Sequence, residues 1–441
     1  MTPPASIAAP ARKRAAGLPP QGEGNMLRRL GPGLITGAAD DDPSGIATYS
    51  QAGAQFRFGL VWTLLLTTPL MIAVQMVSAR IGYVTGRGLA ANMVQVCPRW
   101  LAVAIVMLLV AANTINIAAD VSAMAEATRL LVHGPQWLYV VAYGGLSVVA
   151  QVYVSYERTV RLLKYLTLVL FSYVAVVLVV GVPWAQALTE SAAPWRHLDR
   201  ASLKDYAAMV VAVLGTTISP YLFFWQATQE VEDGKRRAVP QSQRHSPLRI
   251  KAHLRDIRQD TVVGMLLSNV VALCIVLSAA VALNLNGHAD VKSSADAAAA
   301  LRPIAGDLAF VVFSLGIIGT GLLAIPVLAG SAAYAVSEIF GWRAGLSRRF
   351  QDARGFYSII LAATLLGSGL SLLEVDAMAA LVWSAVINGV IAVPIMAVML
   401  AIGRSRALMG RFVVPGPVQA VGWLATGLMG VAALVMLATM A

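Results

Sequence analysis

Residues 31–52 read GPGLITGAADDDPSGIATYSQA, and they predict a membrane-spanning helix that is broken in its middle. Both halves are apolar enough for a bilayer, yet three aspartates, Pro43, Ser44 and Gly45 separate them. Pro43 has no N–H to donate to the carbonyl of Ala39, and Gly45 tolerates almost any backbone angle, so the helix should unwind here. A carboxylate at mid-membrane is costly unless it is paired, hydrated or bound to a cation. We therefore expect a functional site at this break.

The whole chain has the composition of a polytopic membrane protein. Of its 441 residues, 58% are hydrophobic and 12% are charged, whereas a soluble domain carries about 25% charged residues. Two cysteines imply no disulfide framework. Residues 1–25 hold basic residues but no apolar run, so we expect no cleavable signal peptide and interpret them as a disordered cytoplasmic tail.

Eleven apolar runs have the length of about 18–25 residues that a bilayer requires. If the N-terminus is inside, 26 of the 33 Lys and Arg residues fall in cytoplasmic segments. This asymmetry predicts a multi-pass protein of the cytoplasmic membrane with a cytoplasmic N-terminus. The expected spans are residues 31–52, 59–80, 100–130, 137–155, 162–182, 206–229, 261–283, 306–336, 356–373, 377–401 and 418–440.

The sixth span is also interrupted by a proline. Residues 206–229 read YAAMVVAVLGTTISPYLFFWQATQ, and Pro220 leaves the carbonyl of Thr216 without its helical donor. Broken helices at corresponding positions of two five-helix halves are typical of transporters with inverted repeats. We therefore divide a transmembrane domain, residues 26–441, into two repeats and an eleventh helix, at residues 26–205, 206–403 and 404–441.

The two broken helices resemble those of the NRAMP family of divalent-metal transporters. The first-helix signature Asp-Pro-Gly-Asn falls on residues 42–45 (DPSG), where Gly replaces the metal-binding Asn. The sixth-helix signature Ala-x-x-Met-Pro-His falls on residues 216–221 (TTISPY), where Ser219 replaces the Met ligand and Tyr221 replaces the His. The resemblance covers the chain from Gly31 onward and implies an all-α, eleven-helix fold of the LeuT type. Divergent relatives that lack the Met are associated with magnesium, and this chain resembles that branch more than the classical one.

The substitutions leave oxygen atoms as the candidate ligands. A thioether favours transition metals over calcium and magnesium. Magnesium is usually held through one or two carboxylates with several waters retained, so a roomy oxygen site suits it, and hydrated manganese fits as well. The candidate metal-binding groups are the Asp42 carboxylate, the Ala39 and Thr216 carbonyls, the Ser219 hydroxyl and the Asn388 side chain in the tenth span.

Plainer interpretations of the breaks stay open. Asp42 followed by Pro43 is also an ordinary N-cap and first helical residue, although this does not explain why a helix should restart in mid-membrane. Pro220 is also compatible with a simple kink. For Asp40 and Asp41 we favour a structural role over a ligand role.

The third span carries a second set of polar residues. Asn113, Asn116 and Asp120 share one helical face and are candidates for a proton or ion pathway, or the amides hydrogen-bond between helices. In the NRAMP family this helix carries acids tied to proton movement. Asp120 matches one of them, but Asn113 stands where a Glu is expected. A phenol, with an ordinary pKa of about 10, also replaces the family's His at Tyr221, so we expect weak or absent proton coupling.

The expected function is secondary transport of a divalent cation, with Mg²⁺ or Mn²⁺ favoured, by alternating access. The metal is the substrate; we expect no cofactor, no enzyme activity, no nucleic-acid partner and no obligate protein partner, only the lipid bilayer. Two alternatives are a LeuT-fold carrier of a small organic solute such as an amino acid and a channel-like divalent-ion-binding membrane protein. We further expect Glu230, Glu232 and Asp233 to lie at a solvated helix end, followed by a basic loop to residue 260.

Overall fold

The computed structural model describes residues 32–154, 168–194, 203–236, 247–287, 291, 293–346, 348–373 and 376–440. In these ranges the chain forms helices and no strands. Eight described helices, one of them interrupted, are long and apolar enough to cross a membrane, and a bent pair adds a ninth if it counts as one span. The eight are α4 (Val61–Thr85), α6 (Arg99–Leu131), α11 with α12 (Leu203–Thr217 and Pro220–Arg236), α14 (Pro247–Ala282), α17 (Ala309–Phe340), α18 (Arg354–Leu370), α19 (Ala377–Arg404) and α21 (Gly416–Met440).

Helices also occupy the other three expected spans. The first span consists of α2 (Pro32–Asp40) and α3 (Pro43–Phe56), and the fourth is α7 (Gln136–Tyr153). The fifth is described only from η1 (Leu168–Leu170) and α9 (Phe171–Val179), because residues 162–167 lie outside the described part of the chain. The predicted all-α, multi-span architecture is therefore confirmed.

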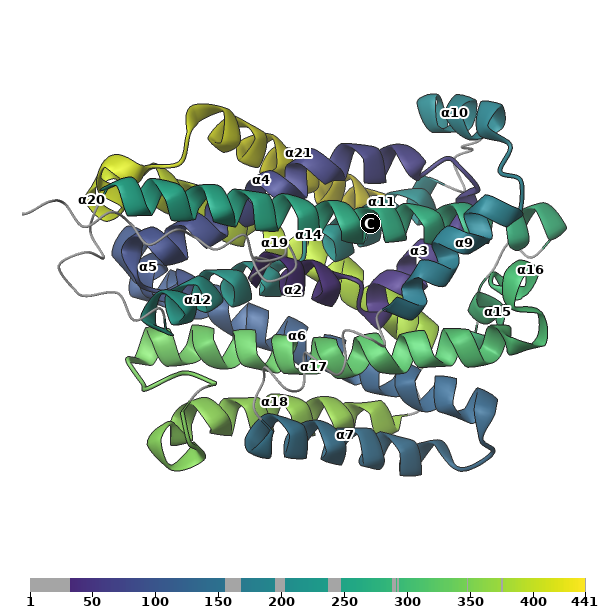
Figure 1. Ribbon diagram of the computed structural model, residues 1–441, viewed down its shortest axis with the longest axis horizontal. Coiled ribbons are helices and arrows are strands. Elements are labelled where there is room, and N and C mark those ends of the chain that lie inside the picture. Colours follow the sequence, from purple (N-terminus) through teal and green to yellow (C-terminus); the bar gives the residue numbers. More distant parts are fainter. Residues whose placement is uncertain are drawn as a thin grey trace, which may run out of the picture.

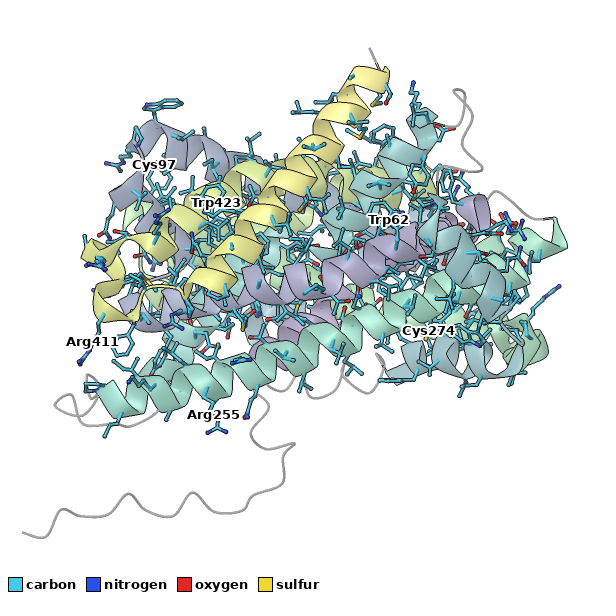
Figure 2. All side chains as sticks on the ribbon, turned by 90° about the horizontal axis from the view of Figure 1, so that it is seen from above. Trp62, Cys97, Arg255, Cys274, Arg411 and Trp423 are labelled. Atoms are coloured by element: carbon cyan, nitrogen blue, oxygen red, sulfur yellow. The ribbon has the colours of Figure 1, made fainter. Side chains whose placement is uncertain are left out.

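Short helices between the spans lie at two opposite ends of the molecule. Those expected in the cytoplasm, α5 (Leu89–Val96) and α20 (Arg406–Met409), lie at one end (Figure 1). Those expected outside lie at the other end: α10 (Trp184–Ala192), α15 (Ser294–Ala299) and α16 (Arg302–Ala305) (Figure 1). Arg411 lies at the end of the molecule where α5 and α20 lie, and Arg255 lies in the same half of the molecule, part-way along α14 (Figure 2). The segments assigned to each side of the membrane thus separate in space.

Both predicted helix breaks are present. The first falls between Asp40 and Pro43, and the second falls between Thr217 and Pro220. Asp42 is the N-cap of α3, in extended backbone conformation, and its Oδ1 accepts a hydrogen bond from the Gly45 N–H at 2.8 Å. Proline at the first position of each restarted helix has no N–H to satisfy, which favours a helix start there. Helices 1 and 6 are therefore discontinuous, as predicted.

The helices form two packed groups, and α19 contacts both. In the first group, which we call the bundle, α2 and α3 pack along α14, and α12 packs on α4. In the second, which we call the scaffold, α6 packs against α7, α17 and α18. Figure 1 shows α17, α18 and α7 stacked on one side of α2 and α12. Helix α11 packs on α3 and α4 and belongs to the bundle. Helix α19 contacts both α6 of the scaffold and α11.

The bundle contains very close backbone approaches at glycines. A methyl group on Gly37 in α2 would lie 2.4 Å from the Gly264 carbonyl oxygen of α14, and one on Gly53 in α3 would lie 2.3 Å from the Val276 carbonyl oxygen. The Gly33 N–H, at the start of α2, donates to the Asp260 carboxylate of α14 at 2.6 Å. Both halves of the first broken helix are therefore fixed to the same neighbouring helix.

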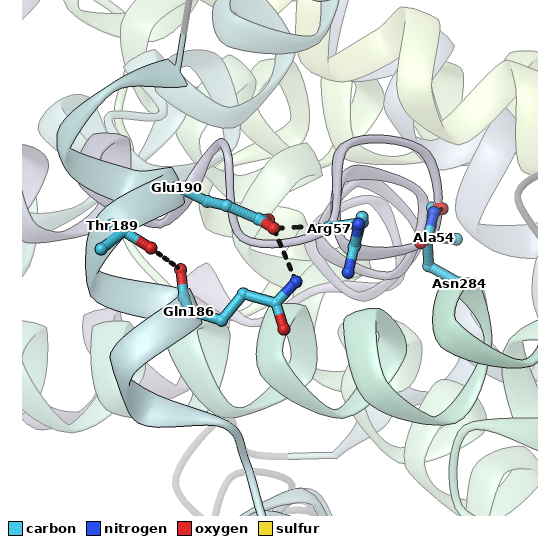
Figure 3. A network of polar contacts seen from close by, with 6 residues as sticks. All are labelled: Ala54, Arg57, Gln186, Thr189, Glu190 and Asn284. Atoms are coloured by element: carbon cyan, nitrogen blue, oxygen red, sulfur yellow. Dashed lines mark hydrogen bonds and ion pairs between the residues drawn. The ribbon is translucent and has the colours of Figure 1, made fainter. Parts of the chain in front are cut away.

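The outer end of α3 is held by polar contacts. The helix ends at Arg57, whose φ of 52° lies in the left-handed region. The Arg57 guanidinium lies 3.8 Å from the Glu190 carboxylate of α10, which also accepts from Gln186 at 2.9 Å (Figure 3). The Asn284 amide, just beyond α14, donates to the Ala54 carbonyl at 2.5 Å.

The expectation for the C-terminal end of α12 was wrong. Helix α12 continues to Arg236 and α14 already begins at Pro247, so most of the predicted loop is helical. Glu230 and Glu232 are 2% and 8% exposed rather than solvated. Glu230 lies 3.4 Å from the His253 imidazole of α14, and Glu232 accepts from the Tyr334 hydroxyl of α17 at 2.6 Å. These contacts compensate the desolvation of the carboxylates. The contact of Glu230 lies within the bundle, whereas that of Glu232 links α12 of the bundle to α17 of the scaffold.

Tyr334→Phe is expected to destabilise the C-terminal end of α12. The Tyr334 hydroxyl donates to Glu232 and accepts from the Leu346 N–H at 3.1 Å, so its removal deprives a buried carboxylate and a backbone N–H of partners. A hydrogen bond to a charged group contributes about 1.5–3 kcal/mol, so amide exchange in the last turns of α12 should accelerate about tenfold. Tyr357→Phe is the control, because that hydroxyl bonds only locally, to the Arg348 carbonyl at 2.9 Å. Equal rates of amide exchange in the two variants would mean that the hydrogen bonds of Tyr334 do not stabilise this end of α12.

Candidate functional site

Asp42 uses its two carboxylate oxygens differently. Oδ1 accepts from the Gly45 N–H at 2.8 Å and from the Ser44 hydroxyl at 2.7 Å, which are the local contacts of a helix cap. Oδ2 accepts from the Asn116 amide of α6 at 3.1 Å and from the Tyr221 hydroxyl of α12 at 3.2 Å. Asp42 is only 2% exposed. One oxygen of Asp42 therefore caps α3, and the other connects α3 to α6 and α12.

Tyr221 connects the two helix breaks. Its hydroxyl lies 3.1 Å from the Ala39 carbonyl oxygen and 3.2 Å from Asp42 Oδ2, and the side chain is fully buried. Two candidate ligands of the first break, Ala39 and Asp42, thus lie within hydrogen-bond distance of one group from the second break. Three oxygen atoms converge here from two discontinuous helices.

Ser219 bonds to its own helix end. Its hydroxyl donates to the Gly215 and Thr216 carbonyls at 3.0 and 2.9 Å, which satisfies backbone groups that the break leaves exposed. A small cavity beside Ser219 is lined by Met71, Gln75 and Met265 of α4 and α14. The space next to the substituted Met position is therefore bordered by thioethers from other helices.

The polar residues of α6 divide between two roles. The Asn113 amide donates to the Leu328 carbonyl and the Ser331 hydroxyl of α17, both at 2.8 Å, so it joins two scaffold helices. Asn116 instead contacts Asp42. Asp120 is fully buried, and neither of its carboxylate oxygens has a hydrogen-bond partner among the described residues. Asn116 therefore contacts the first helix break, whereas Asn113 bonds to α17 instead.

Asn388 of α19 is buried near the second break. It is 1% exposed, and its Oδ1 has no hydrogen-bond partner in the part of the chain that the structure describes. The next residue, Gly389, packs closely against the Gly215 backbone of α11. An unpaired amide oxygen here is a free acceptor for a cation or its water.

Asp40 and Asp41 share a partner that the sequence did not suggest. The Ser268 hydroxyl of α14 lies 3.0 Å from Asp40 Oδ2 and 3.1 Å from Asp41 Oδ1. Ser268 is a small residue within an apolar run, so nothing in the local sequence distinguishes it from packing residues. Ser384 of α19, whose hydroxyl lies 2.7 Å from Asn116 Oδ1, was missed for the same reason.

Four buried carboxyl groups lie at or beside the first helix break and on α6. Asp40, Asp41, Asp42 and Asp120 are all at most 5% exposed, and the ion pairs found among the described residues involve none of them. No cluster of three His, Cys, Asp or Glu side chains in the described ranges is arranged to hold a metal. A cation here would therefore rely on the Asp42 carboxylate together with carbonyl, hydroxyl and amide oxygens, which are the hard ligands that Mg²⁺ and Mn²⁺ accept.

The chain is similar to a known family of proteins. Residues 33–439 match the family described as natural resistance-associated macrophage protein-like, Nramp. A protein named divalent metal cation transporter MntH from Aeromonas hydrophila is 27% identical over 410 residues, which is 91% of this chain and 93% of that relative. The protein of the same name from Verminephrobacter eiseniae is 26% identical over 307 residues, 68% of this chain and 66% of that relative.

Solved structures with the same fold include transporters. The crystal structure of the Eremococcus coleocola manganese transporter with an aromatic bis-isothiourea substituted compound has a TM-score of 0.74 at 17% identity, covering 95% of this chain and 88% of that one. Mhp1, a nucleobase-cation-symport-1 family transporter, has a TM-score of 0.50 at 12% identity, covering 93% and 92%. These likenesses concern the fold, and they confirm the LeuT-type architecture with inverted repeats. With the family match over residues 33–439, the chain belongs to the Nramp family.

Proposed function

We propose that this protein is a secondary transporter that moves a divalent cation, Mg²⁺ or Mn²⁺, across the cytoplasmic membrane. The observation that carries the proposal is the convergence of Asp42 Oδ2, the Ala39 carbonyl and the Tyr221 hydroxyl, from both helix breaks, inside a buried and acidic region. The names of the Nramp relatives, which refer to divalent metal cations and manganese, support the substrate class.

The ion would bind between the two breaks. Asp42 supplies the principal charge, and the Ala39 and Thr216 carbonyls supply further oxygens. Ser219 and Asn388 are additional oxygen donors, through retained water where they do not reach the ion directly. Magnesium keeps several waters and is usually held by one or two carboxylates, so a single ligating carboxylate surrounded by neutral oxygens suits it. Asp120, one turn beyond Asn116 on α6, is the next acid along the path.

Transport would proceed by rocking of the bundle against the scaffold. A membrane potential contributes about 2.3 kcal/mol per charge for each 100 mV, so inward movement of a divalent cation is driven without protons. Proton coupling is weak or absent in this proposal because Tyr221 and Asn113 replace a His and an acid of the family. The N-terminus is cytoplasmic, residues 26–205 and 206–403 form the two repeats, and residues 404–441 carry the last helix. The proposed tail, residues 1–25, lies outside the described residues.

Uptake into proteoliposomes tests the proposal. The purified chain is reconstituted, and uptake of Mg²⁺, Mn²⁺ and Ca²⁺ is measured under a negative-inside potential while an internal dye reports pH. We expect saturable uptake of Mg²⁺ or Mn²⁺ that is faster than that of Ca²⁺ and is not accompanied by acidification. Protein-free liposomes are the control. Acidification in proportion to the metal would overturn the uncoupled mechanism, and amino-acid uptake without metal uptake would overturn the substrate class.

A further inference from the structure

The Asp42 carboxylate is surrounded by protein donors. A carboxylate has about four lone-pair sites, two on each oxygen. Ser44 and Gly45 donate to Oδ1, and Asn116 donates to Oδ2. The single proton of the Tyr221 hydroxyl is shared between Oδ2 and the Ala39 carbonyl oxygen. A cation that approaches Oδ2 therefore competes with the Asn116 amide for this oxygen.

The donors on Oδ2 come from different helix groups. Tyr221 belongs to α12 of the bundle, to which α3 also belongs, and its hydroxyl has a second acceptor in the Ala39 carbonyl at 3.1 Å. Asn116 belongs to α6 of the scaffold, and the bond from its Nδ2 to Asp42 crosses between the two groups at 3.1 Å. Loss of the Tyr221 bond leaves the bundle intact, whereas loss of the Asn116 bond separates bundle from scaffold at this point.

The orientation of the Asn116 amide is fixed on its other side. The Ser384 hydroxyl of α19 lies 2.7 Å from Asn116 Oδ1 and also 2.7 Å from the Leu381 carbonyl oxygen. When its proton is donated to Asn116 Oδ1, the NH₂ group is directed toward the Asp42 carboxylate, which accepts from it at 3.1 Å. Asn116 and Ser384 are both at most 1% exposed, so water does not compete for these contacts. An amide held this way presents positive hydrogens, not its oxygen, to the place where a cation would bind.

We propose that the Asn116 amide substitutes for the ion at Asp42 in the empty carrier, and that ion binding displaces it and frees the scaffold from the first helix break. This inference rests on the proposed function, because it assigns a role to Asn116 within the same metal site. Asn116 is then a positioning residue and a competitor of the metal, not a ligand. The empty carrier is held closed by the Asn116–Asp42 bond, and the loaded carrier lacks it.

The proposal predicts that removal of the Asn116 side chain strengthens metal binding, whereas removal of a metal ligand would weaken it. Asn116→Ala removes the competing donor, so Mn²⁺, used as the probe in titration calorimetry, should bind about tenfold more tightly than to the parent, the effect expected for one hydrogen bond to a charged group. The empty carrier loses the bond that stabilises its closed form. Net Mn²⁺ uptake into proteoliposomes should therefore fall several-fold, while exchange of external for internal Mn²⁺ continues at the parental rate.

Asn113→Ala is the matched control. Asn113 is also a fully buried asparagine of α6, one turn away, but its amide bonds to α17 and does not contact Asp42. It should change thermal stability without tightening Mn²⁺ binding or separating net uptake from exchange. If Asn116→Ala folds poorly, Ser384→Ala provides the second test. It releases Asn116 Oδ1, so the amide no longer holds its NH₂ group toward Asp42, and Mn²⁺ binding should tighten by a smaller amount than in Asn116→Ala.

The outcomes separate the inference from the function that it builds on. Weaker Mn²⁺ binding in Asn116→Ala, or weaker binding in Ser384→Ala, would make Asn116 a ligand or a support of Asp42 and would overturn the inference. Effects equal to those of Asn113→Ala would overturn it too. Absence of Mn²⁺ and Mg²⁺ binding by the folded parent would instead overturn the proposed function, whichever variant is compared.

Discussion

Asp42→Asn is expected to lower uptake of divalent metal about a hundredfold while the protein stays folded. Asparagine is as good an N-cap as aspartate, so its side-chain oxygen can keep the contacts with Gly45 and Ser44 that begin α3. The substitution removes the negative charge that the metal would bind. Truncating one partner of a buried charge pair costs about 2–5 kcal/mol, which corresponds to a loss of about a hundredfold in affinity.

The measurement is Mn²⁺ and Mg²⁺ uptake into proteoliposomes, with melting temperature as the check on folding. Asp42→Ala separates the two functions of the residue, because it loses the N-cap as well as the charge. Its free energy of unfolding should fall by about 1 kcal/mol, which lowers its melting temperature. Metal uptake that survives in Asp42→Asn at the parental rate would move the binding site away from the first helix break.

Gly215→Ala is expected to prevent accumulation of folded protein. A methyl group on Gly215 would lie 2.1 Å from the Ala385 carbonyl oxygen and 2.4 Å from the Gly389 backbone nitrogen, so α11 and α19 would have to move apart. Overpacking of a well-packed interior costs about 1–3 kcal/mol even when flexible side chains yield, and here the obstacle is backbone. The displaced segment leads directly into the second helix break at Thr217.

Gly427→Ala is the matched control for this substitution. Gly427 lies in the middle of α21, and a methyl group there meets no atom within 4 Å. Alanine should be neutral or stabilise by up to about 1 kcal/mol through its higher helix propensity. Yield after size-exclusion chromatography and melting temperature compare the two variants. Equal yields and melting temperatures would mean that α11 and α19 can separate without cost.

The helix breaks could be predicted because their signals are local. Pro43 and Pro220 each remove a backbone donor from an apolar run, and the sequence around them shows this directly. The cap at Asp42 follows from the same short motif. Multi-span architecture follows from run length and from the position of basic residues, and neither requires knowledge of which helices touch.

The partners at the site could not be predicted because they are distant in the chain. Asn116 is 74 residues from Asp42, and Ser384 is 268 residues from Asn116. The sequence left open whether Asn116 lines a pathway or joins helices, since an amide in an apolar helix serves either purpose. The burial of Glu232 was missed for a related reason: its partner, Tyr334, lies on a helix whose contact with α12 has no local signature.

The close packing of the first broken helix on α14 limits how its two fragments can move. Before the break, Gly33 and Gly37 contact α14; at the break, Asp40 and Asp41 contact Ser268; after it, Gly53 contacts α14 again. Because one continuous helix contacts both fragments, they cannot move relative to each other without breaking their contacts with α14. The interruption therefore leaves backbone groups and a carboxylate free of the helical hydrogen-bond pattern, while the two fragments keep a fixed relative position.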